Sequence, residues 1–527
     1  MKVLISDKLS EEGKKVLRER GVEFDDKPGL SPDELKGIIG EYEGLIVRSA
    51  TKATADIIAV ADKLKVIGRA GVGVDNIDIE AATQKGVLVM NTPEGNTVST
   101  AQHTFSMLLS MSRSIPQACA STKEGKWEKN KFKGTEVTGK ILGIIGLGRI
   151  GSVVMDYAKA FGMEVIVYDP FLTKERAQRL AIDQVTLDEL FVRSDYITVH
   201  TPLTRDTKDI INAESIAKMK DGVRILNCAR GGIVDEKALA EAIKSGKVAG
   251  AALDVFSKEP PEDMSLLELP GVIATPHLGA STAEAQDQVA IDVAHQIADY
   301  LQNGKVVNGI NLPSVDEKTY EQLKPFLMLS EKLGSFISQV VKGTVKSLEI
   351  SYSGAINEFD VSSLTRSVVK GFLGAILEGD VNFINAPVLA KDRGIQVKET
   401  KVSDSSDFTS LITVKATNED DVIFSISGSV FGKRMEPRLV RINDFHVDAY
   451  PVGCLVMITN KDHPGAIGRI GTILGECGVN IADMTLGRKS QGETAVIVLN
   501  IDGEIPDDGV EALENLDDVI EAKVINL

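Results

Sequence analysis

Three ionisable side chains, Arg230, Glu259 and His277, each follow a predicted strand. The carboxyl ends of parallel strands are where open α/β sheets bind ligands. An imidazole exchanges protons near neutral pH, a carboxylate can orient it, and a guanidinium binds an anion. Taken singly, each side chain could equally be a capping histidine, a solvated glutamate or a surface arginine. Together, on successive loops of one sheet, they predict proton exchange with an anionic substrate.

A glycine-rich turn precedes these residues. Gly146, Gly148 and Gly151 form the pattern G-x-G-x-x-G, which follows the apolar segment 141–145 and opens a segment with helical apolar spacing. Gly146 permits a tight turn, Gly148 lets backbone N–H groups approach a pyrophosphate, and Gly151 allows close helix–strand packing. Asp169, at the end of the next strand, can accept hydrogen bonds from ribose hydroxyls and repels a 2′-phosphate. The pattern predicts a dinucleotide site that favours NAD over NADP.

A second glycine turn, at Gly71 and Gly73, also follows a predicted strand. It lacks a third glycine, and Asn91 stands where a dinucleotide site would have an acid. Two interpretations stay open: a tight turn within the fold, or a backbone turn that faces a cleft between two domains.

Short apolar strands alternate with amphipathic helices up to about residue 315, which indicates mainly parallel sheets. The first series has strands at 2–6, 44–48, 65–69 and 87–91, with helices such as 31–39 and 78–85 between them. The second series starts at 140 and continues with strands at 164–169, 196–200, 223–228, 248–254 and 272–276. Two long helices are expected to connect the series, one over 97–123 and one over 281–302, the latter opened by a capping box of Ser281 and Glu284.

The last third has a different pattern. We expect a helix over 318–341, β-rich segments over 347–450 with a single helix at 362–378, and a β-α-β-β-α-β unit from 454 onward. The predicted fold class is α/β, with two doubly wound parallel-sheet domains, a Rossmann domain for NAD and a flavodoxin-like domain for the substrate. An α+β intervening domain and a ferredoxin-like domain follow. The predicted domains are 1–98 plus 284–312 (substrate), 99–283 (NAD), 313–450 (intervening) and 451–527 (regulatory).

Composition limits the partners and the location. Among 527 residues, 76 acidic and 59 basic side chains give a net charge of −17, which disfavours nucleic acid and anionic membranes. No stretch approaches the roughly 20 apolar residues of a membrane span. The four cysteines lack ligand-like spacing, so we expect neither disulfides nor a metal site, and a reducing compartment. The first residues read as a strand too short for a signal peptide, which predicts a cytoplasmic protein.

Four segments resemble the motifs of the D-isomer-specific 2-hydroxyacid dehydrogenases. They read GLGRIG at 146–151, NCARGGIVDE at 227–236, DVFSKEP at 254–260 and PHLGAST at 276–282. The resemblance covers residues 1–312. It implies that His277 exchanges the proton, that Glu259 orients the imidazole of His277, and that Arg230 binds the substrate carboxylate. It also implies further NAD contacts at the nicotinamide and the pyrophosphate, made by Thr201, Cys228, Asp254, Arg149 and Ile150.

Segments of the first half resemble those of family members that oxidise 3-phosphoglycerate. They read VRS at 47–49, GRAGVG at 68–73 and NTPEGN at 91–96. The two arginines in them would supply the positive charge that a phosphorylated substrate needs, although surface arginines beside strands are the plainer alternative. The substrate contacts that the resemblance implies are Arg48, Ser49, Arg69, Gly71 and Asn96.

Two other functions stay open. A dehydrogenase of another 2-hydroxy acid, such as glycerate or glyoxylate, would use the same NAD site and the same histidine. An NAD-sensing binding protein, like the dehydrogenase-like transcriptional corepressors, could keep the fold and some of these residues. The sequence also departs from the family at Gln102, where Glu is frequent, while His103 beside it lies in an apolar pattern that favours a structural role.

The C-terminal segments NKDHPGAIG at 460–468 and GVNIADM at 478–484 resemble an ACT domain, and residues 314–450 resemble the intervening domain of long family members. The resemblance implies a symmetric homo-oligomer, a dimer or a tetramer, with L-serine as effector between paired domains. Dimerisation without a ligand is the alternative. The implied effector contacts are Asn460, Asp462 and Asn480.

Overall fold

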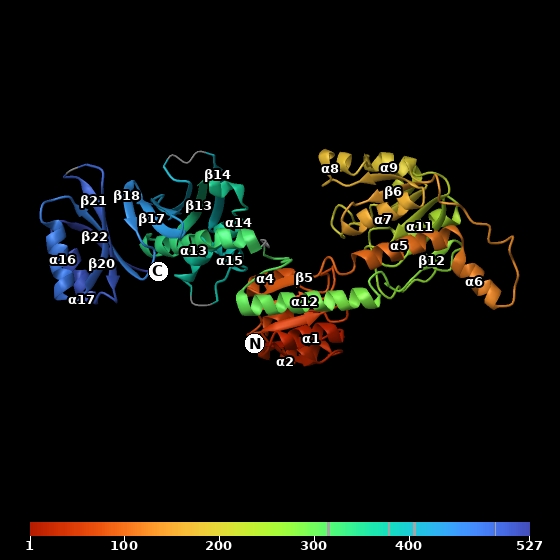
Figure 1. Ribbon diagram of the computed structural model, residues 1–527, viewed down its shortest axis with the longest axis horizontal. Coiled ribbons are helices and arrows are strands. Elements are labelled where there is room, and N and C mark those ends of the chain that lie inside the picture. Colours follow the sequence, from red (N-terminus) through yellow and green to blue (C-terminus); the bar gives the residue numbers. More distant parts are fainter. Residues whose placement is uncertain (313–316, 378–379, 404–406, 491) are drawn as a thin grey trace.

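The structure is a computed structural model and describes residues 1–312, 317–377, 380–403, 407–490 and 492–527. It contains four sheets, numbered here in chain order. Along the longest axis the spatial order is fourth, third, first and second, because α12 (Ala283–Asn303) returns the chain from the second sheet to the first (Figure 1).

The first sheet is parallel, with the strand order β2-β1-β3-β4-β5. Its strands are β1 (Lys2–Ile5), β2 (Glu23–Asp26), β3 (Gly44–Val47), β4 (Val66–Arg69) and β5 (Leu88–Asn91). Its helices are α1 (Glu11–Glu19), α2 (Pro32–Ile38), α3 (Ala55–Ala59), α4 (Ile79–Lys85) and the returning α12. All residues of β3 and β5 are buried, as expected of strands covered by helices on both faces. The edge strand β2, with the sequence EFDD, was not predicted because it has no apolar run.

The second sheet is also parallel, with the order β12-β11-β10-β9-β6-β7-β8. Its strands are β6 (Ile141–Ile145), β7 (Glu164–Tyr168), β8 (Asp183–Gln184), β9 (Tyr196–Val199), β10 (Val223–Asn227), β11 (Val248–Leu253) and β12 (Val272–Ala274). Its helices are α7 (Arg149–Ala160), α8 (Lys174–Arg179), α9 (Leu187–Arg193), α10 (Ala213–Lys218) and α11 (Glu236–Lys244). The strand order reverses between β6 and β9, and such a switch point is where open sheets of this kind bind ligands.

Two predictions about the connecting helices were wrong. The helix expected over 97–123 is two helices, α5 (Thr97–Ser112) and α6 (Ile115–Lys123). Ser114 between them is left-handed, with φ of +49°, and Pro116 in the first turn of α6 has no N–H with which to continue the hydrogen bonding of α5. The capping box of Ser281 and Glu284 does not form, because the cap of α12 is one residue later: the Thr282 side chain accepts from the N–H of Ala285 at 3.2 Å.

The third sheet is mixed, with the order β14-β13-β15-β16-β17-β18. Its strands are β13 (Val345–Gly354), β14 (Gln396–Val402), β15 (Ser410–Asn418), β16 (Ile423–Phe431), β17 (Glu436–Ile442) and β18 (Phe445–Ala449). Its helices are α13 (Glu317–Val340), α14 (Ser362–Gly374) and α15 (Ala386–Asp392). The prediction of a single helix within 347–450 was therefore wrong. Helix α14 ends earlier than residue 378, which lies outside the described residues, and α15, with 7 residues, is too short for a clear helical pattern of apolar residues.

The fourth sheet is antiparallel at every pairing of its order β20-β21-β19-β22. It is built from β19 (Cys454–Lys461), β20 (Asn480–Arg488), β21 (Thr494–Asp502) and β22 (Val519–Asn526), with α16 (Ala466–Glu476) and α17 (Asp507–Glu514). This is the predicted β-α-β-β-α-β order, and the predicted fold class is confirmed. The predicted domain boundary at residue 313 lies outside the described residues.

Candidate active site

Arg230, Glu259 and His277 follow β10, β11 and β12, which are neighbours in the second sheet. Nδ1 of His277 lies 2.7 Å from Oε2 of Glu259, and Oε1 accepts from the N–H of Phe256 at 3.1 Å. The arginine loop packs on the same segment, since a Cβ at Gly231 would lie 1.9 Å from the Phe256 carbonyl oxygen. A carboxylate can only accept, so Nδ1 of the imidazole carries a hydrogen and Nε2 is left to take up a proton.

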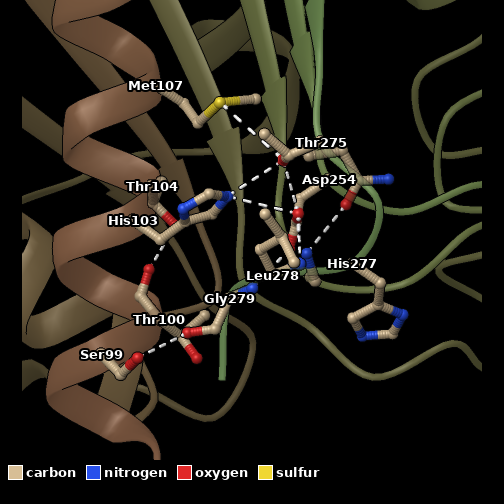
Figure 2. A network of polar contacts seen from close by, with 12 residues as sticks. Ser99, Thr100, His103, Thr104, Met107, Asp254, Thr275, His277, Leu278 and Gly279 are labelled. Carbon is tan, nitrogen blue, oxygen red and sulfur yellow. Dashed lines mark hydrogen bonds and ion pairs between the residues drawn. The ribbon is translucent and has the colours of Figure 1, made fainter. Parts of the chain in front are cut away.

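A buried carboxylate, that of Asp254, holds the loop on which His277 stands (Figure 2). It accepts from the N–H groups of Leu278 at 2.7 Å and Gly279 at 2.8 Å, and from the Thr275 hydroxyl at 2.6 Å. The N–H of His277 donates to the Asp254 carbonyl oxygen at 2.9 Å, with φ of His277 at +55°. Burial alone would raise the pKa of the Asp254 carboxyl, but the hydrogen bonds it accepts hold that pKa below its usual value.

Arg230 points from the second sheet to the first. Its Nε lies 3.1 Å from Oδ2 of Asp75, and its Nη1 donates to the carbonyl oxygen of Ala229 at 2.7 Å. A Cβ at Gly73 would lie 1.9 Å from Nη2 of Arg230, so a side chain here would displace the guanidinium from this place. The structure therefore favours the second interpretation of the turn at 71–73, in which its backbone faces the neighbouring part of the molecule.

A second guanidinium, that of Arg69, stands beside this turn. A Cβ at Gly71 would lie 1.7 Å from Nη1 of Arg69. Burial lowers the pKa of Arg69 to about 10, and the positive charges of Arg230 and Arg48 act in the same direction. Among the residues that the structure describes, Nε of Arg69 is buried without a hydrogen-bond partner. A buried cation with an unused donor is suited to hold an anion.

The other predicted substrate residues differ in how they are placed. Arg48 follows β3, the strand that pairs with the strand of Arg69, and its Nη1 donates to the carbonyl oxygen of Lys8 at 3.2 Å. Asn96 directly precedes α5, and in the described parts of the chain its Oδ1 is buried and unpartnered. Ser49 is exposed. Asn96 thus has a polar atom available to a ligand, Arg48 adds a positive charge near Arg69, and the role of Ser49 rests on its position in the sequence alone.

The glycine loop after β6 has the local geometry that its pattern predicts. Gly146 has φ of +93°, a conformation that side chains rarely adopt, and a Cβ there would lie 2.7 Å from the Thr201 side chain. A Cβ at Gly151 would lie 2.3 Å from the carbonyl oxygen of Gly146, so helix and turn are closely packed. Gly148, by contrast, meets no atom within 4 Å, and α7 begins at the next residue, Arg149. An open backbone at a helix N-terminus is suited to a pyrophosphate.

The other predicted cofactor residues lie around this loop or near the strand ends. The Asp169 carboxylate accepts from the N–H of Leu147 at 2.7 Å, which places it beside the glycine turn. The hydroxyl of Thr201 is buried, and no described residue satisfies it. Burial raises the pKa of Cys228 to about 12, so its thiol stays protonated. The open Gly148 and the orphaned Thr201 hydroxyl fit a bound NAD, while Asp254 is already engaged by its own loop.

The three predicted effector residues do not lie together within one chain. Asn460 is the last residue but one of β19, and the carboxylate of the nearby Asp462 pairs with Nη1 of Arg488 at 3.0 Å. Asn480 begins β20 and pairs with Asp502 at the far end of β21, whereas Asn460 pairs near its start. A site that uses all three residues would need a second copy of the domain.

Two residues with contacts in the active site were not assigned a role from the sequence. Asp75 binds Arg230, and His103, predicted as structural, lies 3.2 Å from Asp254. An acid just after a glycine turn was a usable signal for Asp75, but an ordinary apolar helix pattern offered none for His103.

In the described ranges, no group of three or more His, Cys, Asp or Glu side chains could hold a metal ion, and no helix has the length and apolar character to cross a membrane.

Three family models match successive parts of the chain. They are described as the NAD binding domain of D-isomer specific 2-hydroxyacid dehydrogenases (residues 105–279), the D-3-phosphoglycerate dehydrogenase intervening domain (322–443) and the ACT domain (455–518). The fold and the site thus define an NAD-dependent dehydrogenase of the D-isomer-specific 2-hydroxyacid class.

Full-length relatives narrow this class. The chain is 45% identical to the D-3-phosphoglycerate dehydrogenase of Bacillus subtilis (strain 168), over 100% of this chain and 99% of that one. It is 44% identical to that of Methanocaldococcus jannaschii, over 100% of both. The crystal structure of an NAD⁺-bound 3-phosphoglycerate dehydrogenase from Entamoeba histolytica is 32% identical, with a TM-score of 0.51 over 60% of this chain and 99% of that one. The chain belongs to the D-3-phosphoglycerate dehydrogenase family.

Proposed function

We propose that the protein oxidises 3-phospho-D-glycerate to 3-phosphohydroxypyruvate with NAD, the first step of L-serine biosynthesis. The names of its full-length relatives support this substrate. The observation that carries the proposal is a cluster of arginines: the guanidinium groups of Arg230 and Arg69 meet the same glycine turn at 71–73, and Arg48 follows the strand next to that of Arg69. Such a cluster suits a substrate with two anionic groups, a carboxylate and a phosphate.

Each side chain then has a distinct task. Nε2 of His277 takes the proton of the C2 hydroxyl, while Glu259 keeps the imidazole in the tautomer whose Nε2 is unprotonated. Arg230 holds the carboxylate and polarises the C2–O bond as it becomes a carbonyl. Arg69 and Arg48 hold the phosphate. When bound, NAD accepts the hydride from C2. We propose that the glycine loop, Asp169 and Thr201 hold the NAD molecule.

We also propose the finer features of the molecule. The four predicted domains, with their stated boundaries, form a homo-oligomer, a dimer or a tetramer, in which L-serine binds at paired ACT domains. The match to the ACT domain supports a small-molecule effector, and the separation of Asn480 from Asn460 within one chain supports a site shared between two copies. The four free cysteines fit a cytoplasmic enzyme.

A reductase assay tests the substrate. NADH oxidation is followed with phosphohydroxypyruvate, hydroxypyruvate and glyoxylate, each with and without L-serine. We expect a strong preference for phosphohydroxypyruvate, and slower turnover with serine present. Preference for an unphosphorylated acid would make the protein a dehydrogenase of another 2-hydroxy acid. Absence of turnover with all three acids would instead favour an NAD-sensing binding protein.

The role of His277 is tested by His277→Asn. We expect kcat to fall by about 10²–10⁴-fold, the contribution typical of a general acid–base group, with NAD binding unchanged. The matched control is His295→Asn, because His295 is an exposed histidine on α12. Loss of NAD binding in His277→Asn, or kcat like that of the control, would remove His277 from the reaction.

A further inference from the structure

Helix α5 passes beside the loop of His277 and contacts it at two points (Figure 2). The Ser99 hydroxyl donates to the carbonyl oxygen of Gly279 at 2.8 Å. Four residues further along the helix, Nε2 of His103 lies 3.0 Å from the Thr275 hydroxyl and 3.2 Å from Oδ1 of Asp254. Because these two residues are one helical turn apart, they face the loop together.

The hydrogens in this network can be assigned from the chemistry of its members. The Asp254 carboxylate only accepts, and it takes the single hydroxyl hydrogen of Thr275 at 2.6 Å. The Thr275 oxygen can then only accept from the imidazole, so Nε2 of His103 carries a hydrogen. Asp254 is 1% exposed, and all of its hydrogen-bonding capacity must be met from within the protein. His103 is therefore one of the donors that make this buried charge tolerable.

The same carboxylate controls the backbone on both sides of His277. It binds the two N–H groups that follow the histidine, and its own residue accepts the N–H of His277 through the carbonyl oxygen. His277 stands at φ of +55°, a conformation that costs free energy in a residue other than glycine and persists only where neighbours impose it. Figure 2 shows its imidazole pointing away from the network, so the contacts set the place of the ring without engaging it.

We infer that His103 is a positioning residue for the dehydrogenase reaction. Through Asp254 and Thr275 it fixes the loop that carries His277, and it ties this loop to α5, whose first residue follows Asn96. The inference rests on the proposed function only in that His277 exchanges the proton. It assigns to His103 an effect on the chemical step, beyond the structural role that its place in an apolar helix suggests.

The test compares two replacements of His103 in the full-length protein. His103→Leu removes the donor, whereas Gln in His103→Gln has a side-chain N–H that can reach a similar place. We expect His103→Leu to lower kcat by about 10²-fold, the scale of a small misplacement of a reacting group, with KM and NAD binding little changed. His103→Gln should recover most of this loss. The control is Gln102→Leu, because Gln102 is the exposed neighbour on the same helix.

Thr275→Val keeps the inference testable if His103→Leu folds poorly, and the two changes together form a double-mutant cycle. Thr275→Val removes the hydroxyl that bridges the imidazole and the carboxylate, and it should lower kcat in the same way. The double variant of His103→Leu and Thr275→Val should lose little more than either single variant, because both changes act on one network. Equal kcat in His103→Leu and the control, or additive losses in the cycle, would overturn the inference. If the wild type reduces none of the three keto acids, the proposed function fails instead.

Discussion

The part of the molecule built on the first sheet has two neighbours, and the two contacts differ in kind. Its contact with the second sheet, the Arg230 contact, includes the pairs Asp75–Arg230 and Glu94–Arg149 and the glycine turn between β4 and α4. The acids of these pairs are 73% and 75% exposed. Nearby, buried polar atoms of Arg69 and Asn96 have no partner within the described residues.

Its contact with the third sheet, the Ile384 contact, is built like a core. Ile384 is 2% exposed and belongs to the hydrophobic cluster of the first sheet, although it precedes α15 of the third (Figure 1). The amide of Asn382 donates to the carbonyl oxygen of Gly86 at 3.0 Å. Asn382 and Asn385 also cap each other, since Oδ1 of each accepts a backbone N–H of the other. This contact satisfies the amides of the segment and encloses its apolar side chain.

This difference indicates which of the two contacts rearranges when a ligand binds. Exposed ion pairs contribute little to stability, and unpartnered buried groups favour a state in which a ligand satisfies them. Buried aliphatic surface and satisfied amides, by contrast, stabilise one arrangement. We therefore expect the Arg230 contact to rearrange on substrate binding and the Ile384 contact to persist.

The largest effect is expected from Ile384→Ala. Truncation of this buried side chain should lower the free energy of unfolding by about 2–5 kcal/mol, as for other large-to-small changes in a core. Urea and thermal unfolding measure it, with Ile376→Ala as control, because Ile376 is 55% exposed in the same part of the chain. An unchanged unfolding curve for Ile384→Ala would show that the Ile384 contact is a loose surface contact.

Sequence patterns predicted the elements whose local signal is strong. Continuous apolar runs located the central strands of both parallel sheets, and the pattern of the last 75 residues predicted the β-α-β-β-α-β order of elements along the chain. Weak local signals explain the predictions that were wrong. Strand β2 was missed because it ends in two acids, and the break at Ser114 was missed because it lies inside an otherwise helical pattern. The cap of α12 was placed one residue too early because Ser281 and Thr282 are both suited to cap a helix.

For the site, position relative to strand ends was enough to nominate Arg230, Glu259 and His277, because parallel topology brings such loops together. The position of a residue in the sequence could not show which distant residues its side chain contacts. Asp75 and Arg230 are 155 residues apart in sequence, and His103 and Thr275 are 172 apart. The first contact depends on how the two sheets pack and the second on how α5 packs against the second sheet, and no local pattern encodes either.

A smaller effect, confined to the Arg230 contact, is expected from Arg69→Met. Because burial lowers the pKa of Arg69, the folded protein holds this charge at a cost when no anion is bound. Methionine should leave the unliganded protein equally stable or about 1 kcal/mol more stable. It should raise KM for phosphohydroxypyruvate by about 10²-fold, since a buried charge partner of the substrate is lost. Arg18→Met on α1 is the control, with Arg18 58% exposed, and a destabilised Arg69→Met would mean that Arg69 serves the fold.

The smallest effect is expected from Asp75→Asn. Asp75 is the group that occupies Nε of Arg230 at 3.1 Å, where we propose that the substrate carboxylate binds. Loss of its charge should free the guanidinium and lower KM for phosphohydroxypyruvate about two- to fivefold, the range of an exposed ion pair, with kcat unchanged. The difference from wild type should shrink at high salt, because screening weakens the pair that competes with the substrate. Asp56→Asn, the same change at an exposed site on α3, controls for net charge. A higher KM in Asp75→Asn would mean that Asp75 holds Arg230 in place for the substrate, and the Arg230 contact would then be a fixed part of the site.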